Sequence, residues 1–265
     1  MPRLQPSQFQ IVTDILLQQP FNTFFALAVT EQQVGGEVYA DNCEKPKSLL
    51  VLHPYGMALL WGETQNQSFN QEVSKVLSVA PSAQLRHRWV QIYPHFWGNL
   101  VNSLPDNNNS LKVERFTRSN FQFDETVYLQ WKVAQQPSNE IVVPIDATIF
   151  GEMPGAVVPK YFWKSAADFI QNGAGFTVLR NGRPASTAFA AYCHGSFLEI
   201  GIETIPECWG EGLAQISCSA LIDYCLERGL TPVWSCREEN VASLRLAQKL
   251  GFIPSVTLPN FRINY

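Results

Sequence analysis

The sequence lacks the features that mark membrane-spanning and secreted proteins. Its apolar-leaning stretch near the start, residues 21–29, is far shorter than the about 20 residues that a membrane-spanning helix needs. The basic segment and cleavage pattern of a secretory signal are also missing, because residues 1–19 carry one Arg and one Asp among glutamines. We therefore expect a cytoplasmic protein with no membrane partner.

An excess of positive charge is missing as well. The chain has 19 Lys and Arg residues against 23 Asp and Glu residues, which gives a formal net charge of −4. This balance provides no sequence-wide attraction for nucleic acid or anionic lipid. We therefore expect no nucleic-acid partner.

Cysteine pairs at metal-binding or redox spacing do not occur. The six cysteines include no C-x-x-C pair, which predicts reduced thiols rather than a disulfide framework. Only the adjacent Cys193 and His194 come near the clustering that zinc needs. A packing or loop role is favoured for both, so no metal site is predicted.

Apolar residues are abundant enough for a real core. The 265 residues are 46% hydrophobic and 12% aromatic, which excludes a disordered or fibrous chain. Residues 135–139 concentrate turn formers without apolar residues and form the best linker candidate. We place a domain boundary there, between residues 1–136 and 137–265. The first part alternates short apolar runs with polar connections, which predicts an α/β domain without a catalytic pattern.

The second part has the pattern of a mixed α/β sheet. Asn181-Gly182 is the strongest short signal for a hairpin turn. A strand, a helix closed by Gly229 and a further strand form a βαβ unit, so the two strands should be parallel neighbours with a right-handed crossover. The predicted elements are strands over 140–145, 175–180, 185–192, 197–205 and 231–236, and helices over 161–171 and from 213 to Gly229.

Two glycines lie at the junction between one of these strands and its helix. Gly210 and Gly212 permit positive φ angles and let a ligand approach bare backbone. The helix that follows points unpaired N–H groups and its positive dipole end at the turn, which suits a pyrophosphate. A plain tight turn before a helix explains the two glycines equally well.

A second motif is a short helix with a signal at each end. Asn240 is a good N-cap, and Gly251 is a C-terminal stop before Phe252. An ordinary core helix would have the same pattern. The order of the two motifs distinguishes them from such generic elements.

Together these elements resemble the GNAT N-acetyltransferase superfamily over about residues 140–265. The family's loop, Gln/Arg-x-x-Gly-x-Gly/Ala, falls on residues 207–212, and its later Asn and Gly-Phe fall on Asn240 and Gly251-Phe252. The resemblance implies the GNAT acyl-CoA N-acyltransferase fold, with acetyl-CoA as acyl donor. It implies that the donor is bound by Ile205, Trp209, Gly210, Glu211, Gly212, Leu213, Ala214, Asn240 and Ser243.

The chain also looks like a branch of that superfamily with an additional amino-terminal region. Residues 157–164 and 232–236 carry this likeness. It implies that residues 1–136 are a degenerate copy of the same α/β fold.

The loop departs from the family pattern in its charge. Glu207 replaces a basic or amide residue, and Glu211 adds a second carboxylate. Because carboxylates repel a pyrophosphate, binding would depend on backbone N–H groups, the helix dipole and cations elsewhere, such as Arg245 or Lys249.

Two carboxylates on one strand are the candidate catalytic residues. Strand alternation places Glu199, Gly201 and Glu203 on one face. A carboxylate there could accept a proton from an ammonium substrate, directly or through water. Glu203 is favoured because it lies nearer the cofactor loop. A solvated strand face is the alternative, and a bulge would break the alternation.

The general acid and the substrate are not readable from the sequence. Many family members have a Tyr seven residues after the Asn, where this chain has Ala247. The first hypothesis is an acetyl-CoA-dependent N-acetyltransferase that acts on a primary amine of a small acceptor. The alternative is a catalytically silent acyl-CoA-binding regulatory protein. An amino-terminal half that serves for homodimer formation is compatible with either.

Overall fold

The computed structural model describes residues 1–81, 85–106, 111–136 and 138–265. Contacts between residues divide the chain into two units. Unit 1 comprises Met1–Ser119, Arg237–Glu239 and Val256–Tyr265, and unit 2 comprises Asn120–Cys236 and Asn240–Ser255.

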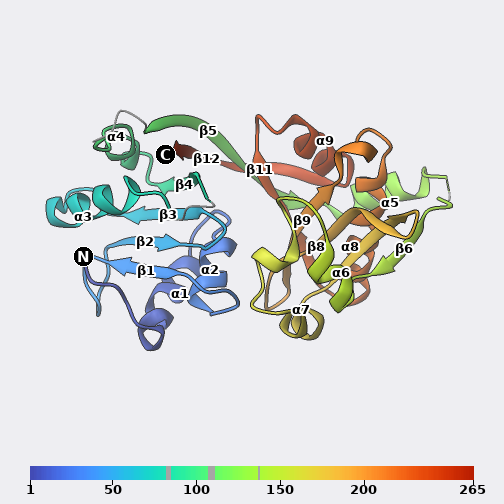
Figure 1. The fold of residues 1–265 in the computed structure, drawn as a ribbon, viewed down its shortest axis with the longest axis horizontal. Coiled ribbons are helices and arrows are strands. Elements are labelled where there is room, and N and C mark those ends of the chain that lie inside the picture. Colours follow the sequence, from blue (N-terminus) through green and yellow to red (C-terminus); the bar gives the residue numbers. More distant parts are fainter. Residues whose placement is uncertain (82–84, 107–110, 137) are drawn as a thin grey trace. The chain divides into compact units, whose positions relative to one another are not determined.

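Unit 1 is built around strands with a crossover helix (Figure 1). Strands β1, β2 and β3 pair antiparallel, whereas β3 and β4 pair parallel across α3. The same order of antiparallel strands and βαβ crossover was predicted for the second half of the chain. The elements are η1 (Pro6–Gln8), α1 (Phe9–Leu17), α2 (Phe24–Thr30), β1 (Glu37–Ala40), β2 (Ser48–Leu52), β3 (Met57–Gly62), α3 (Gln67–Leu77), β4 (His87–Tyr93), α4 (Trp97–Asn102) and β5 (Lys112–Phe123).

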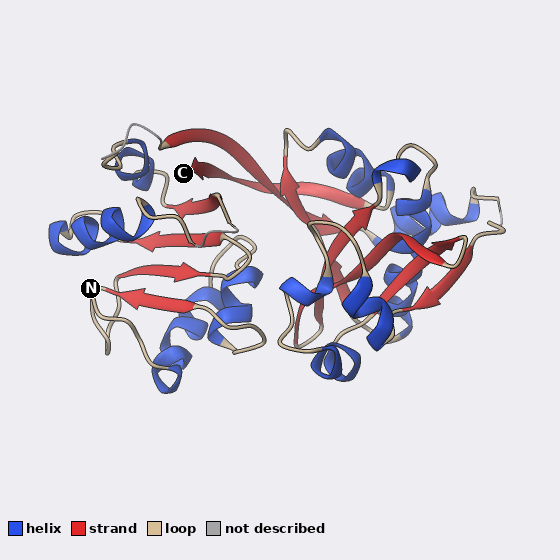
Figure 2. Ribbon diagram, viewed as in Figure 1, coloured by secondary structure: helices blue, strands red, loops and turns tan. Residues whose placement is uncertain are grey.

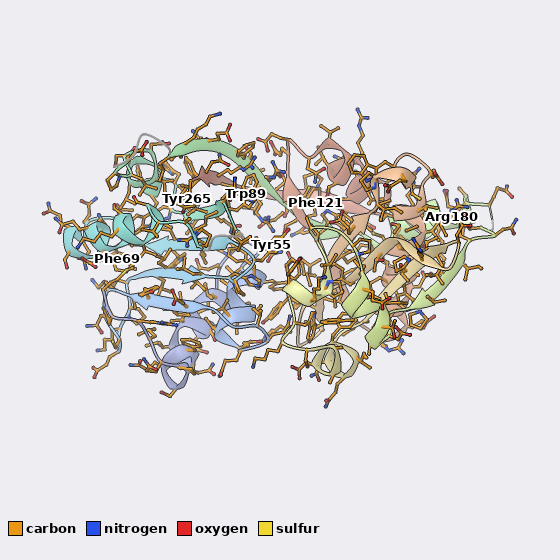
Figure 3. The ribbon with its side chains drawn as sticks, viewed as in Figure 1. Tyr55, Phe69, Trp89, Phe121, Arg180 and Tyr265 are labelled. Atoms are coloured by element: carbon orange, nitrogen blue, oxygen red, sulfur yellow. The ribbon has the colours of Figure 1, made fainter. Side chains whose placement is uncertain are left out.

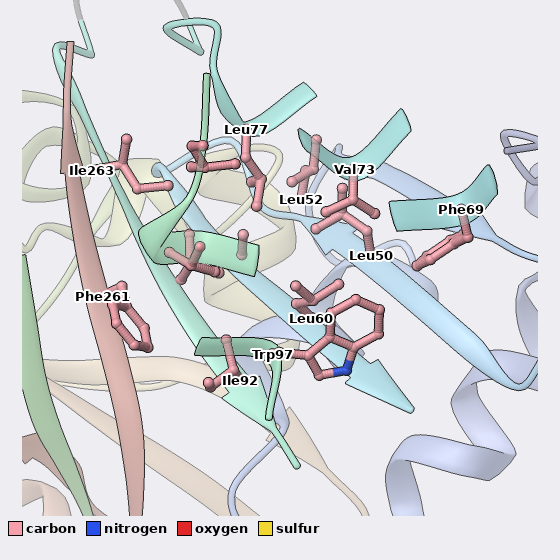
Figure 4. Close-up of a cluster of buried hydrophobic side chains, with 14 residues drawn as sticks. Leu50, Leu52, Leu60, Phe69, Val73, Leu77, Ile92, Trp97, Phe261 and Ile263 are labelled. Carbon is pink, nitrogen blue, oxygen red and sulfur yellow. The ribbon is translucent and has the colours of Figure 1, made fainter. Parts of the chain in front are cut away.

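Helix α3 covers one face of this sheet (Figure 4). Asn66 caps the helix by accepting a hydrogen bond from Phe69 N–H at 3.1 Å. The residues at four-residue spacing, Phe69, Val73 and Leu77, are at most 1% exposed and belong to the unit 1 core. Burying each such side chain contributes about 1.5–3 kcal/mol, so the spacing read from the sequence fixes the helix on the sheet.

Unit 2 has the mixed sheet that the sequence predicts (Figure 2). Its strand order is β10-β9-β8-β7-β6, with antiparallel pairs from β6 to β9 and a parallel pair β9–β10. Asn181 and Gly182 have φ angles of 52° and 75°, which confirms the predicted hairpin turn. The elements are α5 (Glu125–Val133), β6 (Ile141–Pro144), α6 (Ala147–Glu152), η2 (Pro159–Tyr161), α7 (Ala166–Asn172), β7 (Gly175–Arg180), β8 (Arg183–His194), β9 (Phe197–Thr204), η3 (Pro206–Cys208), α8 (Leu213–Glu227), β10 (Thr231–Val233), β11 (Ser235–Arg237), α9 (Val241–Lys249) and β12 (Phe252–Asn264).

One predicted helix is wrong in its first half. The helix expected over 161–171 begins only at Ala166, because Ser165 caps it by accepting a hydrogen bond from Asp168 N–H at 3.1 Å. The preceding residues Phe162 and Trp163 are buried, with 8% and 4% exposure, outside any α-helix. The apolar spacing that indicated a helical turn here thus comes from buried aromatic residues outside the helix.

The division by contacts differs from the boundary expected at residue 136. It falls between Ser119 and Asn120, inside the 12-residue strand β5. The last strand returns in the opposite direction, since residues 256–265 belong to unit 1 and β12 pairs antiparallel with β4. Strands β5 and β12 thus each contribute residues to both units. A domain boundary at residue 136 stays a prediction, and Pro137 of the expected linker lies outside the described residues.

A buried histidine in the turn between β2 and β3 should make stability depend on pH. His53 is 4% exposed, its Nδ1 accepts a hydrogen bond from Tyr55 N–H at 3.0 Å, and burial lowers its pKa from 6.5 to about 4. The unfolded chain binds a proton between these values while the folded chain does not. Stability should therefore fall as the pH drops from about 6.5 towards 4, by roughly 2 kcal/mol between pH 7 and pH 5.

The measurement is the free energy of unfolding in urea at pH 7 and pH 5. His53→Asn keeps a hydrogen-bond acceptor for Tyr55 N–H and removes the titrating ring. We expect the variant to lose about 2 kcal/mol of the pH-dependent change. Equal pH dependence in both proteins would show that His53 does not titrate in this way.

Candidate functional site

Two parallel strands of unit 2 part after a short pairing. Strands β9 and β10 are in register over three residue pairs, of which the last joins Glu199 and Val233. At Trp234 the chain changes partner, because the Trp234 carbonyl accepts a hydrogen bond from Phe121 N–H at 3.1 Å. The next strand, β11, belongs to the seven-stranded sheet beside β5. The single strand predicted over 231–236 is therefore wrong.

The consequence is an unpaired strand edge. Strand β10 ends the five-stranded sheet, so in the described part of the chain no strand pairs with this edge of residues 200–204. Backbone N–H and C=O groups on such an edge need partners, which a ligand in extended conformation can supply. This edge runs from Glu199 towards the glycine loop.

The glycine loop presents open backbone at the start of α8. Gly210 and Gly212 have φ angles of 83° and 81°, and Gly212 is the N-cap residue. Apart from the residues next to it in the chain, a Cβ atom at Gly210 would meet no atom within 4 Å, and one at Gly212 would meet only the Gln215 amide at 3.9 Å. No side chain caps the 15-residue helix. Its first N–H groups and dipole therefore face a mouth that an anion can enter.

Trp209 directly precedes the first glycine of this loop. Its indole is 69% exposed and donates a hydrogen bond to the Thr204 carbonyl at 2.7 Å. The indole thus occupies the last carbonyl group of β9.

The acidic loop has a cation partner that the sequence did not reveal. Arg180, at the end of β7, contacts Glu211 at 3.1 Å and Glu140 at 2.8 Å (Figure 3). The expectation that Glu211 repels a diphosphate therefore omits a neighbouring guanidinium. Glu207 is exposed on η3, where solvent screens its charge.

Glu203 holds a loop on the sheet face opposite α8. Its carboxylate accepts hydrogen bonds from Ala156 N–H at 2.9 Å and Val157 N–H at 2.6 Å. Gly155, with a φ angle of 122°, leaves room for it, because a Cβ there would lie 2.5 Å from the Glu203 Cγ. Two backbone donors fix the carboxylate as an anchor of residues 155–157.

Glu199 lies where β9 and β10 part. It is 8% exposed and accepts a hydrogen bond from the Ser235 hydroxyl at 2.9 Å. The register shift in this region lies on β8, between Ala190 and Tyr192, so β9 keeps its alternation. Glu199 and Glu203 are four residues apart, about 13 Å along the strand, and each has its own partners. The two carboxylates therefore act as separate groups.

The later motif residues serve the structure of α9 and its surroundings. Asn240 accepts a hydrogen bond from Ser243 N–H at 3.3 Å, as its predicted N-cap role requires. The Ser243 hydroxyl accepts a hydrogen bond from the Trp234 indole at 3.2 Å. Ala247 is fully buried, so no polar side chain takes its place there. Whether Asn240 and Ser243 contact a cofactor stays a prediction.

The remaining residues predicted to bind the cofactor have apolar side chains, so only their backbone N–H and C=O groups could form hydrogen bonds with it. Ile205 and Leu213 pack against a small buried cluster that contains Val178, and Leu213 is 2% exposed. Ala214 has no polar side chain. Within the described residues, no group of three His, Cys, Asp or Glu side chains could hold a metal ion, and no helix is long and apolar enough to cross a membrane.

Unit 1 is built differently at its own βαβ crossover, where a pocket of about 320 Å³ beside the start of α3 is lined by Thr64, Gln65, Asn70, Phe96, Trp97, Asn99 and Leu100. Strands β3 and β4 stay paired over five residue pairs, from Met57–Trp89 to Trp61–Tyr93. The N-terminus of α3 is capped by Asn66, and the Trp97 indole donates to the Gly62 carbonyl at 3.1 Å. The two units thus share a topology but differ at the place where a ligand would bind.

A protein-family model described as GNAT acetyltransferase matches residues 14–260. The chain belongs to this family. It is 26% identical over 230 residues to the uncharacterized N-acetyltransferase YdfB of Bacillus subtilis (strain 168), covering 86% of this chain and 85% of that protein. The match to the GNAT family model thus includes residues of both units.

Solved structures show the same fold. The crystal structure of a GCN5-related N-acetyltransferase-like protein from Streptococcus suis 89/1591 has a TM-score of 0.74 and 21% identity, covering 97% of this chain and 99% of that one. A tandem GNAT protein from the clavulanic acid biosynthesis pathway has a TM-score of 0.59 and 10% identity, covering 98% and 96%. The matches support a GNAT fold preceded by a degenerate copy in unit 1.

Two features of the site were missed by the sequence. Arg180 belongs to the predicted hairpin, and its contact with Glu211 joins residues 31 positions apart. Ser235 touches Glu199 across the parting strands. No local pattern in the sequence marks either pair.

Proposed function

We propose that the protein is an acetyl-CoA-dependent N-acetyltransferase that acts on a primary amine of a small acceptor. The observation that supports it most is the parting of β9 from β10 beside an open glycine loop in unit 2. The loop and α8 would hold the diphosphate, and the edge of residues 200–203 would pair with the extended pantetheine arm.

Glu199 is the proposed general base. It lies at the last residue pair before the strands part, where an acyl group lying along β9 would end. It accepts the proton of the substrate ammonium, directly or through water, and the neutral amine nitrogen then attacks the thioester carbon. Ser235 orients the carboxylate. Glu203 positions residues 155–157 beside this face.

Backbone groups of β9 supply the remaining help. An unpaired N–H of residues 200–204 can donate to the thioester oxygen as it gains negative charge. The tetrahedral intermediate loses a proton from its positively charged nitrogen to water and collapses by breaking the carbon–sulfur bond, and the departing thiolate takes its proton from water. A thiolate with a pKa near 8.5 leaves without a dedicated acid, so Ala247 in place of Tyr is compatible with turnover.

The silent-binder alternative is favoured by one specific observation. Ala247 is fully buried at the position where the family resemblance implies a Tyr. A binding protein would need the loop and strand edge but no base. Release of thiol from acetyl-CoA across a panel of amines separates the two functions. Amine-dependent release that Glu199→Gln abolishes supports the enzyme, and tight binding without release in any arm supports the silent binder.

Arg180 should decide how well the acidic loop accepts a diphosphate. Arg180→Met removes the guanidinium that neighbours Glu211 and leaves that carboxylate uncompensated. We expect the Kd for CoA to rise about tenfold at low salt, and less at high salt because the charges are partly exposed. Isothermal titration at two salt concentrations measures this.

Glu211→Gln is the matched reverse change. Removing the carboxylate while keeping Arg180 should lower the Kd for CoA at low salt. The pair contacts at 3.1 Å, so the double variant should lie between the single variants. Unchanged affinity in both single variants would exclude Arg180 from cofactor binding.

A further inference from the structure

Two guanidinium groups of unit 1 lie close to one indole, whereas the glycine loop belongs to unit 2. Arg237 lies 4.3 Å from the Trp89 ring and 5.2 Å from the Phe116 ring, and Arg262 lies 5.6 Å from Trp89. The two rings contact each other edge to face, with centroids 5.2 Å apart. Strands β4, β5, β11 and β12 each contribute one member. Figure 3 labels Trp89.

Neither guanidinium forms a salt bridge within the described residues, although the charge of Arg262, after those of closer partners, helps to lower the pKa of Glu114. Among the described residues, no salt bridge involves Arg237 or Arg262, and the Arg262 Nε is buried without a hydrogen-bond partner. Both side chains are only partly exposed. Cation–π contacts account for part of their stabilisation, but they leave the N–H forks unpaired.

The nearby acidic residues are already engaged. Glu114 contacts Lys112 at 3.1 Å and accepts a hydrogen bond from Asn264 at 3.0 Å. Glu238 accepts one from the Ser119 hydroxyl at 2.7 Å, and Glu239 accepts one from Thr117 N–H at 3.1 Å. These carboxylates therefore use other donors, and within the described residues none of them forms a salt bridge with Arg237 or Arg262.

The pKa of His87 responds to the charges of the same two guanidiniums. Its ring lies 6.0 Å from Trp89, and its pKa is lowered first by burial and then by Arg262 and Arg237. A neutral His87 adds a hydrogen-bond donor at the edge of the cluster without adding charge.

We propose that Arg237, Arg262 and Trp89 form a binding site for the oxyanion group of a small molecule, a carboxylate or a phosphate. Two partly buried guanidiniums without a salt-bridge partner are costly, and the oxygens of an oxyanion match their forks in bidentate geometry. Trp89 and Phe116 hold the guanidiniums in place through the cation–π contacts. The site is separate from the glycine loop and does not depend on acetyl transfer.

Isothermal titration of the full chain with inorganic phosphate and with benzoate tests this site and distinguishes the two oxyanions. We expect saturable binding of at least one probe at millimolar concentration. Arg237→Gln and Arg262→Gln should each weaken it at least tenfold. Arg262→Lys, which keeps the charge and loses the fork, should weaken it less than Arg262→Gln and guards against a folding defect.

Arg228→Gln is the matched control. Arg228 also stacks on an aromatic ring, 3.8 Å from Tyr224, but it has a carboxylate neighbour in Glu227 at 3.6 Å. Its replacement should leave anion binding unchanged. The proposal is overturned if neither probe binds, if the Arg237 and Arg262 variants bind as the wild type does, or if binding is lost in Arg180→Met instead.

Discussion

Glu199→Gln lowers kcat for amine acetylation about a hundredfold or more, with little change in the Kd for acetyl-CoA. A positioned general base contributes about 10²–10⁴ to the rate, and glutamine keeps the size and the hydrogen bond from Ser235 but cannot take the proton. The measurement is thiol release under saturating acetyl-CoA, beside a titration that gives the Kd.

Glu203→Gln is the matched control on the same strand. Its amide oxygen can still accept the hydrogen bonds of Ala156 and Val157, so kcat should fall less than tenfold. The sequence alone favoured Glu203 as the base because of its place near the loop. A large loss in Glu203→Gln with normal turnover in Glu199→Gln would reverse the two roles.

Replacing both loop glycines by alanine raises the Kd for CoA at least tenfold. Gly210 and Gly212 both have positive φ angles and open space where a Cβ would lie. The added methyl groups stand where the diphosphate approaches, and the strained backbone moves the N–H groups of α8. Titration calorimetry of the double variant with CoA gives the change.

The control carries the same strain elsewhere. Gly182 and Gly229 also have positive φ angles, and an added Cβ at either position would meet no atom within 4 Å. Alanine at both costs about 1–2 kcal/mol per residue, as it does in the loop. If this control loses CoA affinity as the loop variant does, general destabilisation explains both results.

Local signals predicted most of unit 2. The hairpin at Asn181-Gly182, the N-cap at Asn240 and the glycine loop before Leu213 each depend on a few adjacent residues, and the structure has each of them in place. The parallel pair β9–β10 followed from a handedness rule that applies to any short crossover. These features can be predicted from the sequence because each depends on interactions between residues that are close together in the chain.

Long-range partners explain what the sequence could not predict. The strand predicted over 231–236 is interrupted at Trp234, because the Trp234 carbonyl accepts a hydrogen bond from Phe121 N–H, more than a hundred residues earlier in the chain. The engagement of Glu203 by Ala156 and Val157 likewise joins distant segments. Strands β5 and β12 contribute to both units, which no alternation of apolar residues reveals.

The two units differ at their strand–helix–strand crossovers, and this difference predicts how many acetyl-CoA molecules one chain binds. Both have a strand–helix–strand crossover, but only in unit 2 do its parallel strands part after three residue pairs, whereas in unit 1 they stay paired over five. The capped start of α3 and the uncapped start of α8 follow the same division. One unit should therefore bind acetyl-CoA and the other should not.

The number of acetyl-CoA molecules bound per chain tests this account most directly. Isothermal titration of the full chain should give one site, and the Gly210→Ala/Gly212→Ala double variant should weaken that site. A titration with no heat at millimolar acetyl-CoA, or one that fits two equivalent sites per chain, would contradict it.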